Sequence, residues 1–461
     1  MKRNVKAILL VFSMLFVLLP FAQETSADSL DDIRQIIRDL YIDDVPEAVL
    51  ERSTANGIMD YLDPHSIYMS AKDYQGFINR LEQRVVGIGV VLEEDLKGVR
   101  VTSVISKGPA ERAGIQPGDV ITHVDQRSMA GQSMETAASW IGGAADTTVE
   151  VTIERPGQAK SLVMRMTREL MSMASVESTM LGGNIGYIGL NSFATDSAKE
   201  MNEAIRSLKG AKGWIVDLRN NGGGYTTAAQ EVMGFLPNAG GAFQLREKNS
   251  DPVNYQAITQ PTKLVGPRHL LINASSASAS EMVAAAVKEQ KLATLYGQTS
   301  YGKGTMQSMF EFEDGSVLKL TTARFYSPGG QAVDKVGVKP NVVTAKGAEL
   351  EVSHRAQLIG QLKGYRQLPK LEHVPITKTF TVKMDSTMSW DTFDKSAVQL
   401  IQLGGKENEV AIEVKDDQSV TVVPQQALVS GEHYVLIVHP RWRGTNHQLM
   451  RQGIYVDVTV K

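Results

Sequence analysis

The spacing of hydrophobic residues changes several times along the chain, and each change marks a separate part. Apolar residues such as Leu30, Ile33 and Ile37 recur at helical spacing and predict a helical N-terminal segment over residues 28–84. Over residues 85–168 the pattern becomes short, β-branched runs that are separated by glycine and proline turns. Such a pattern is typical of a small β-rich domain.

Residues 169–345 alternate strand patterns with helix patterns, which predicts an α/β core. The expected strand and helix pairs are 185–190 with 198–208, 213–218 with 228–236, and 269–273 with 280–288.

The remainder of the chain predicts a connector and a second β-rich domain. Residues 346–376 are charged and mostly helical, so we expect them to form a linker. Residues 377–461 alternate again, as at Phe380, Val382 and Met384, and predict an all-β domain of the sandwich type. The expected fold class is therefore multidomain, α/β plus β.

The N-terminus has the layout of an export signal. Lys2, Arg3 and Lys6 precede a nearly continuous apolar run, 7–19, which is short for a membrane span. We expect a signal peptide over residues 1–27, with an uncleaved anchor as the alternative. Either form places the body of the protein outside the cytoplasmic membrane, whether secreted or attached to the membrane or cell wall.

Composition narrows the possible chemistry. The 461 residues are 42% hydrophobic and 21% charged, with a formal net charge of −3, which is ordinary for globular domains and gives no sign of nucleic-acid binding. The absence of cysteine excludes disulfides, thiol catalysis and cysteine-ligated metals. No cofactor or metal is expected.

A glycine loop opens the β-rich domain at Gly87, Ile88, Gly89 and Val90 and is followed by "GPAERAGIQPGDVI". This combination resembles a PDZ domain over residues 85–168. The resemblance implies that the loop amides bind a peptide's terminal carboxylate while the peptide adds a strand beside them. The alternative is a small β-barrel in which the glycines only form a turn.

A serine cluster in "NASSASASEM" follows an apolar strand and offers Ser276, Ser278 and Ser280 as nucleophiles. A serine hydroxyl needs a base to accept its proton. His269 is the histidine nearest in sequence, but five strand residues place it roughly 16 Å away, so a Ser-His-Asp site would need a distant histidine.

Lys303, in "YGKG", is the better candidate for the base. An ordinary lysine has a pKa of about 10.4 and would have to lose about three units, which burial against apolar groups can achieve. The alternative is a solvated loop lysine. Gln307 lies four residues later, on roughly the same face, where its amide oxygen can orient the amine.

Amide hydrolysis also needs hydrogen-bond donors for the oxyanion. The N–H of Ala279 at a helix start and the glycine turn 222–224 after "VDLRNN" are candidates. A phosphate-binding loop is the alternative interpretation of the glycine turn, but no GKS or GKT sequence follows it.

Together these segments resemble the carboxy-terminal processing proteases, also called tail-specific proteases, over residues 30–345. The resemblance implies a crotonase/ClpP-like protease core over residues 169–345. It makes Ser278 the nucleophile and Lys303 the base, which Gln307 orients. It also implies an oxyanion hole and one supporting carboxylate: Gly223, Gly224, Ala279 and Glu281. The matching segments are "YLDPHSIYM", the PDZ block, "IGYIGLNSF", "WIVDLRNNGGGY", "NASSASASEM", "YGKGTMQ" and "LTTARFYSPGGQAVDKVGVKPNV".

Three positions depart from the family pattern. Gly222 stands where proline is common, Ser300 where threonine is frequent, and Glu289 where aspartate is often found. None of them removes the serine or the lysine.

We therefore expect an exported serine endopeptidase that binds flexible or apolar C-terminal tails through its PDZ domain and cleaves by way of an acyl-enzyme. One alternative is a catalytically silent or gated PDZ peptide-binding scaffold, and another is a crotonase-like thioester hydrolase. The segment "VTVVPQQALVSGEHYVLIV" resembles bacterial immunoglobulin-like domains. It suggests a cell-wall or protein partner, or a role in homo-oligomerisation.

Overall fold

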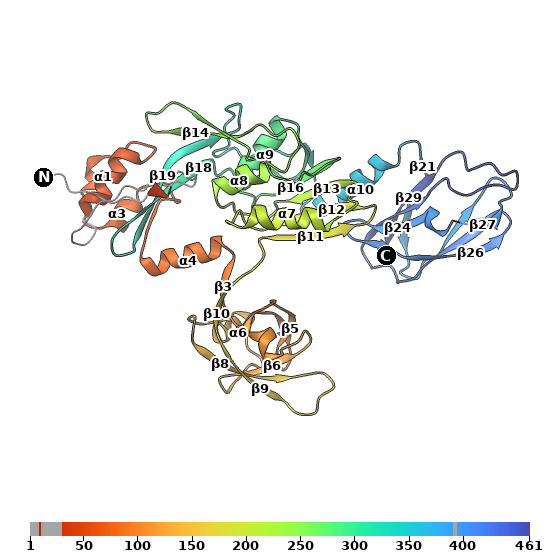
Figure 1. The fold of residues 1–461 in the computed structure, drawn as a ribbon, viewed down its shortest axis with the longest axis horizontal. Helices are drawn as coiled ribbons and strands as arrows, with labels where there is room; N and C mark the ends of the chain where they lie inside the picture. The colour runs from red at the N-terminus through yellow and green to blue at the C-terminus, as the bar shows by residue number, and fades with distance from the viewer. Residues whose placement is uncertain (1–8, 11–29, 391–393) are drawn as a thin grey trace. The chain divides into compact units, whose positions relative to one another are not determined.

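The computed structural model describes residues 9–10, 30–390 and 394–461, and Figure 1 shows them as a ribbon. The chain forms two compact units, Ser70–Ser175 and the remainder. Apart from β1 (Leu9–Leu10), which pairs with β18, the expected signal peptide lies outside the described residues. None of the helices in the described ranges is both long enough and apolar enough to cross a membrane.

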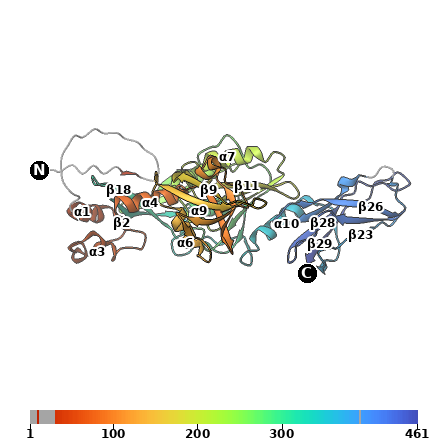
Figure 2. The same ribbon diagram turned by 90° about the horizontal axis from the view of Figure 1, so that it is seen from below.

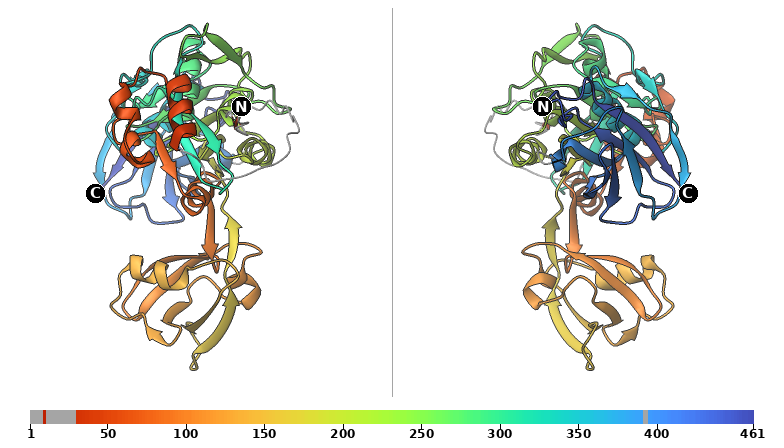
Figure 3. Two further views of the ribbon diagram at one scale, coloured as in Figure 1. Left: turned by 90° about the vertical axis from the view of Figure 1, so that its left-hand side faces the viewer. Right: turned by 90° about the vertical axis from the view of Figure 1, so that its right-hand side faces the viewer.

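The unit Ser70–Ser175 begins with α4 (Ala71–Leu81), whose N-cap Ser70 accepts a hydrogen bond from the N–H of Asp73. A six-stranded antiparallel sheet follows, with short helices and a separate two-stranded ribbon, and its strands enclose a small core (Figure 3). The sheet strands are β4 (Val90–Asp95), β5 (Gly98–Val104), β6 (Val120–Val124), β7 (Arg127–Ser128), β8 (Thr148–Glu154) and β9 (Leu162–Thr167). The ribbon is β3 (Arg84–Gly87) with β10 (Glu169–Ser172), and the helices are α5 (Pro109–Ala113) and α6 (Met134–Ile141).

The α/β core of the larger unit is a six-stranded sheet in the order β11-β12-β13-β16-β17-β20, parallel except for the β11–β12 pair. The strand–helix alternation expected from the sequence is present here. Its strands are β11 (Val176–Leu181), β12 (Ile185–Leu190), β13 (Gly213–Asp217), β16 (Arg268–Ile272), β17 (Thr294–Gly297) and β20 (Val342–Val343). The helices α7 (Ser197–Ser207), α8 (Thr226–Met233) and α9 (Ala279–Glu289) share the main hydrophobic core with this sheet.

A second, antiparallel sheet in the order β1-β18-β19-β14-β15, with β2 beside β19, completes the core. Its strands are β2 (Ile67–Met69), β14 (Gly241–Glu247), β15 (Val253–Gln256), β18 (Thr305–Glu311) and β19 (Val317–Tyr326). Phe310, Leu318 and Leu320 of this sheet pack in one cluster with Ile33 and Ile37. The N-terminal helices, α1 (Leu30–Leu40), α2 (Glu47–Leu50) and α3 (Ala55–Met59), are thereby attached to the core.

The C-terminal residues form two sheets that enclose a common core (Figure 2). One sheet has the order β21-β29-β28-β24-β25 with β22 beside β29, and the other has the order β23-β27-β26. Phe380 and Val422 from the smaller sheet pack with Leu436 and Val458 from the larger. The strands are β21 (Arg366–Gln367), β22 (Leu371–Val374), β23 (Phe380–Lys383), β24 (Val398–Gln402), β25 (Glu407–Asn408), β26 (Val410–Asp416), β27 (Ser419–Pro424), β28 (His433–Val438) and β29 (Ile454–Val460).

Helix α10 (Glu349–Gln361) joins the α/β core to the C-terminal sheets (Figure 1). One side of α10 packs on the parallel sheet, in a cluster that includes Leu271 and Tyr296. The helix residue Leu358 packs with Ile401 and Val435 of the C-terminal sheet. The segment expected as a linker therefore contains a helix that packs against both the parallel sheet and the C-terminal sheet.

Candidate active site

Ser278 lies at the turn between β16 and α9 and has an unusual backbone conformation. Its φ is 56° and its ψ is −115°, and it is the residue directly before the helix. Positive φ is uncommon for a residue with a side chain, and such strain clusters at functional sites because the surrounding structure must enforce it. The combination of positive φ with a ψ of −115° lies outside the left-handed helical region and marks a strained backbone at Ser278.

The two neighbouring serines are occupied by structural hydrogen bonds. Ser276 and Ser280 are both fully buried. The Ser276 hydroxyl donates to the carbonyl of Leu218 at 2.7 Å, and the Ser280 hydroxyl donates to the carbonyl of Asn221 at 2.9 Å. Both bonds join the serine loop to the glycine turn, whereas Ser278 is partly exposed. Of these three serines, Ser278 alone is accessible as a nucleophile.

The carboxylate of Glu281 links the backbone of Ser278 to the loop that carries Lys303. Its Oε2 accepts from the backbone N–H groups of Ser278 and Lys303, each at 2.9 Å. Its Oε1 accepts from the N–H of Gly302 and the hydroxyl of Ser300, each at 2.6 Å. Because both nitrogens contact the same oxygen, the backbone nitrogens of Ser278 and Lys303 can be no farther apart than twice the 2.9 Å length of these hydrogen bonds.

The side chain of Lys303 lies in a partly buried, charged environment. Burial lowers the pKa of its amine, while the negative charges of Asp63 and Glu281 act in the opposite direction, and the net shift is downward. A glycine after the lysine is required because a Cβ at Gly304 would lie only 2.2 Å from the backbone nitrogen of Asp334. The backbone next to Lys303 therefore lies in close contact with Asp334, in the segment that follows β19.

The glycine turn lies directly against the serine. A Cβ on Gly223 would be 2.8 Å from the Ser278 Cβ and 3.0 Å from the nitrogen of Ala279, so only glycine fits there. Asn221, fully buried, accepts from the N–H of Gly223 at 2.8 Å and donates to the carbonyl of Leu190 at 2.7 Å. The turn is thus fixed by an asparagine side chain.

These contacts divide the roles of the expected oxyanion residues. The N–H of Gly223 is already bonded to Asn221. Within the described residues, the N–H groups of Gly224 and Ala279 donate to no protein acceptor. Gly223 therefore provides space beside the serine, and Gly224 and Ala279 provide the free donors.

Gln307 lies near the start of β18 and is nearly buried. Its Nε2 donates to the hydroxyls of Thr305 at 3.0 Å and Thr321 at 3.1 Å. In the described part of the chain no hydrogen bond joins Gln307 to Lys303. The side chain is held in place by threonines.

A turn in the N-terminal segment, which motif reasoning did not place in the site, also reaches this region. Asp63 accepts from the hydroxyl of Thr321 at 3.0 Å, the hydroxyl of Ser66 at 2.6 Å and the N–H of His65 at 2.8 Å. Burial raises the pKa of Asp63, but these hydrogen bonds outweigh it and leave the pKa lowered. Because the bond to Thr321 spans 258 residues, no local sequence pattern reveals it.

The histidines do not supply a base that is bonded to Ser278. His269 bonds to the hydroxyl of Ser353 at 3.0 Å, and burial lowers its pKa to about 4. Burial and the nearby charge of Lys303 lower the pKa of His65. The described residues contain no group of three or more His, Asp or Glu side chains arranged to hold a metal.

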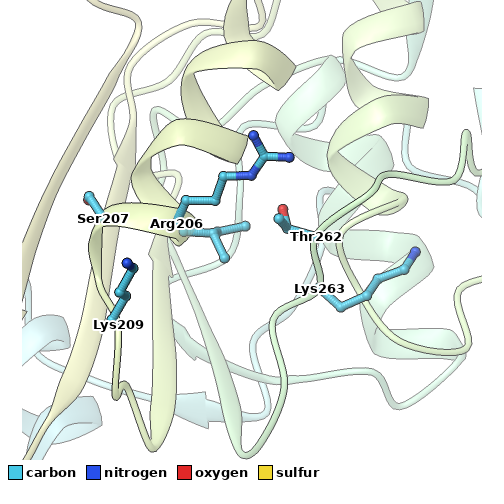
Figure 4. A pocket seen from close by; sticks show the side chains of 6 residues that line it. Arg206, Ser207, Lys209, Thr262 and Lys263 are labelled. Atoms are coloured by element: carbon cyan, nitrogen blue, oxygen red, sulfur yellow. The ribbon is translucent and has the colours of Figure 1, made fainter.

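A surface hollow lies elsewhere in the core. It is lined by the side chains in Figure 4, which come from the end of α7 and the segment before β16: Ile205, Arg206, Ser207, Lys209, Thr262 and Lys263. Its cationic lining contains none of the residues that surround Ser278. The hollow therefore has no part in the serine site.

The glycine loop of the other unit has free amides as well. Ile88 is buried, and its carbonyl accepts from the N–H of Ala110 at 2.8 Å. The carbonyl of Gly89 accepts from the N–H of Ile105 at 2.9 Å. Within the described ranges the N–H groups of Ile88 and Gly89 donate to no protein acceptor. With Gly87 and Val90 at the adjoining strand ends, the loop leaves these two amides available to a carboxylate.

Comparisons with known proteins identify the family and several relatives of this chain. The family model for Peptidase family S41 matches residues 184–344, and the model for a PDZ domain matches residues 100–155. The chain is 31% identical over 415 residues to the carboxy-terminal processing protease CtpA of Bacillus subtilis, covering 88% of both proteins. It is 30% identical to the carboxy-terminal-processing protease of Bartonella bacilliformis, covering 74% of this chain and 81% of that protein.

A solved photosystem II D1 C-terminal processing protease is 25% identical, with a TM-score of 0.45, and the match covers 69% of this chain and 93% of that one.

Proposed function

The chain belongs to the carboxy-terminal processing proteases, serine peptidases of family S41 that carry a PDZ domain, and we propose that Ser278 and Lys303 form its catalytic dyad. The observation that carries this proposal is the Glu281 carboxylate, which binds the backbones of both residues through one oxygen. The positive φ of Ser278 and the lowered pKa of Lys303 support it further.

In the proposed reaction the neutral amine of Lys303 accepts the hydroxyl proton as Ser278 Oγ attacks the substrate carbonyl. The oxyanion accepts hydrogen bonds from the N–H groups of Gly224 and Ala279, which lack protein acceptors. The lysine ammonium then gives its proton to the leaving amine, and an acyl-enzyme remains. Water attacks the acyl carbonyl with Lys303 again as the base, and Ser278 regains its proton.

The lowered pKa matters because an ordinary lysine has only about one neutral amine in a thousand near pH 7.4. Burial of Lys303 raises the neutral fraction. The carboxylates of Asp63 and Glu281 oppose that effect and limit the shift. The amine is thereby kept basic enough to take the serine proton.

The experiment is cleavage of a denatured test protein by matched variants. Ser278→Ala and Lys303→Ala should each abolish cleavage while thermal unfolding stays nearly unchanged. Ser275→Ala is the control, since Ser275 is exposed and only its backbone N–H is bonded, to Asn273. Retained activity in Ser278→Ala or Lys303→Ala would refute the dyad.

The alternative function is a silent or gated scaffold that binds peptides through its PDZ domain. Its support from the sequence was the glycine at position 222, but the turn is held by Asn221 rather than by a proline ring. A serine-reactive phosphonate probe separates the two functions. Labelling that is lost in Ser278→Ala supports the protease, and absent labelling of the native chain supports the scaffold.

We further propose that the loop Gly87–Val90 binds the C-terminal carboxylate of a flexible, apolar protein tail, which the free amides of Ile88 and Gly89 support. Export by residues 1–27 is part of the same proposal. So is an immunoglobulin-like character of the two C-terminal sheets, with a cell-wall component, a protein or a second copy as partner. Sequencing the N-terminus of protein recovered from the culture medium tests export.

A further inference from the structure

We propose that Asp63 is a positioning residue of this active site, which orients Gln307 through Thr321 and places a negative charge beside Lys303. The inference rests on the dyad proposed above. It adds the N-terminal segment to the catalytic machinery, because Asp63 belongs to the turn that leads into β2.

The first step of the argument is the direction of the hydrogen bonds. An ionised carboxylate only accepts, so the Thr321 hydroxyl must donate its single proton to Asp63 Oδ1, at 3.0 Å. The same hydroxyl can then only accept from Gln307, whose Nε2 lies 3.1 Å away. Asp63 therefore dictates which end of the Gln307 amide faces Thr321.

The second step concerns what remains of that amide. Both protons on Gln307 Nε2 are used, one toward Thr321 and one toward Thr305. Within the described residues no hydrogen bond reaches Oε1, so this oxygen is left as the acceptor that the lysine ammonium needs. An asparagine at position 63 would carry a neutral amide that can donate to the Thr321 hydroxyl. The hydroxyl could then donate to Gln307, and the relay formed by these two hydrogen bonds would run in the opposite direction.

The third step is electrostatic and involves two partly buried lysines. Lys319 on β19 donates from Nζ to the carbonyl of His65 at 2.9 Å. Burial, followed by the charge of Lys303, lowers the pKa of Lys319 to about 8, and Asp63 opposes the shift. Asp63 likewise raises the pKa of Lys303 against the effect of burial. One carboxylate therefore acts on both amines.

The charged and titratable groups around this cluster come from five elements. Tyr41, which follows α1, accepts a hydrogen bond from the backbone N–H of Asp63 at 3.1 Å. The N-terminal turn contributes Asp63 and His65, α9 contributes Glu281, β19 contributes Lys319, and the segment after β19 contributes Asp334. Asp63 differs from the others because it is hydrogen-bonded to Thr321 and also raises the pKa values of both Lys303 and Lys319.

The test is the pH dependence of kcat/KM for cleavage of a flexible, quenched fluorescent peptide by the full chain. Asp63→Asn should lower kcat/KM about tenfold and move its acidic limb about one unit toward lower pH, because a neighbouring negative charge is lost. Lys319→Gln should move the limb toward higher pH, because a neighbouring positive charge is lost. Asp60→Asn, an exposed aspartate, is the control and should match the wild type.

A second pair of variants separates the relay from the charge. Thr321→Val removes the hydroxyl but leaves Asp63 ionised, so activity should fall while the acidic limb stays in place. Thr321→Ser keeps the hydroxyl and should restore most of the activity. Asp63→Glu, which keeps the charge, should leave the limb near the wild-type position.

The outcomes are distinct from failure of the dyad. If Ser278→Ala retains cleavage, the proposed function fails. If Ser278→Ala is inactive but Asp63→Asn shows wild-type activity and an unshifted limb, the role of Asp63 is refuted. Should Asp63→Asn not fold, equal activities of Thr321→Val and the wild type would refute the relay, and an unshifted limb in Lys319→Gln would refute the electrostatic part.

Discussion

The carboxylates of Asp63 and Glu281 both raise the pKa of Lys303 against the effect of burial, but they differ in burial and in their hydrogen-bond partners. Glu281 is fully buried and accepts mainly from backbone N–H groups, so it fixes where the main chain of the site runs. Asp63 is only partly buried and accepts from two hydroxyls and one N–H, so it fixes how side chains are oriented. The comparison indicates that Glu281 fixes the backbone positions of the site, whereas Asp63 fixes the directions of its side-chain hydrogen bonds.

The largest expected effect is loss of the Glu281 carboxylate. Glu281→Ala leaves four donors without an acceptor, two of them buried and two partly buried, which should lower the free energy of unfolding by about 3–5 kcal/mol and abolish cleavage. Chemical denaturation measures the first effect. Glu203→Ala, on the exposed side of α7, is the control. Equal stability of the two variants would contradict the linking role of Glu281.

A smaller effect is expected when only one of these donors is removed. Ser300 donates to Glu281 and accepts from the N–H of Val338 at 2.6 Å. Ser300→Ala should cost about 1–3 kcal/mol, since one buried N–H loses its acceptor while the other three bonds to Glu281 remain. Ser300→Thr, which keeps the hydroxyl, should recover most of the loss in the same denaturation experiment. A Ser300→Ala variant as stable as the wild type would show that this donor is dispensable.

The contribution of Asp63 to stability should depend on pH. Its pKa is lower in the folded chain than the ordinary value near 3.9, so the ionised form stabilises the fold at neutral pH. That stabilisation should be lost as the pH falls from about 4 through the lowered folded-state pKa. Denaturation of wild type and Asp63→Asn at pH 7, 5 and 3 should show a difference that shrinks toward pH 3. A difference that is constant with pH would argue against an ionised Asp63.

The smallest effect is expected at Gly222, which lies outside both hydrogen-bond networks. A Cβ at this position meets no atom within 4 Å, and the residue has no positive φ. Gly222→Ala should therefore leave cleavage unchanged and stabilise the chain by at most about 1 kcal/mol. A large loss of activity would show that the turn needs a flexible residue at this position.

Sequence reasoning predicted the half of the site that is local in the chain. The strand before Ser278 and the helix after it follow from hydrophobic periodicity, and α9 begins at Ala279, close to the expected start. The family resemblance selected Ser278 among the three serines. The structure adds a physical reason, because the bonds to Leu218 and Asn221 show that Ser276 and Ser280 are occupied. The assignment of Gln307 as the residue that orients Lys303 stays a prediction.

The other half could not be predicted, because its contacts are distant in sequence or polar. Asp63 meets Thr321 only through folding, and the matching segment around it, "YLDPHSIYM", assigned no role to Asp63. Helix α10 resembled a connector because the residues that it buries are largely polar. Each of them finds a partner in another element: Glu349 with Arg219, Ser353 with His269, His354 with Gly182, and Gln357 with Trp214. Hydrophobic patterns do not detect burial of that kind.

The position of α10 limits how this protein can be shortened or recombined. A chain trimmed at residue 345 would expose Leu271 and Tyr296 to water, and the partly buried guanidinium of Arg219 would lose Glu349, one of its two carboxylate partners. A fusion of the C-terminal β sheets to another enzyme would have to include residues 349–361. For any truncation or fusion, the protease core, α10 and the C-terminal β sheets therefore behave as one structural unit.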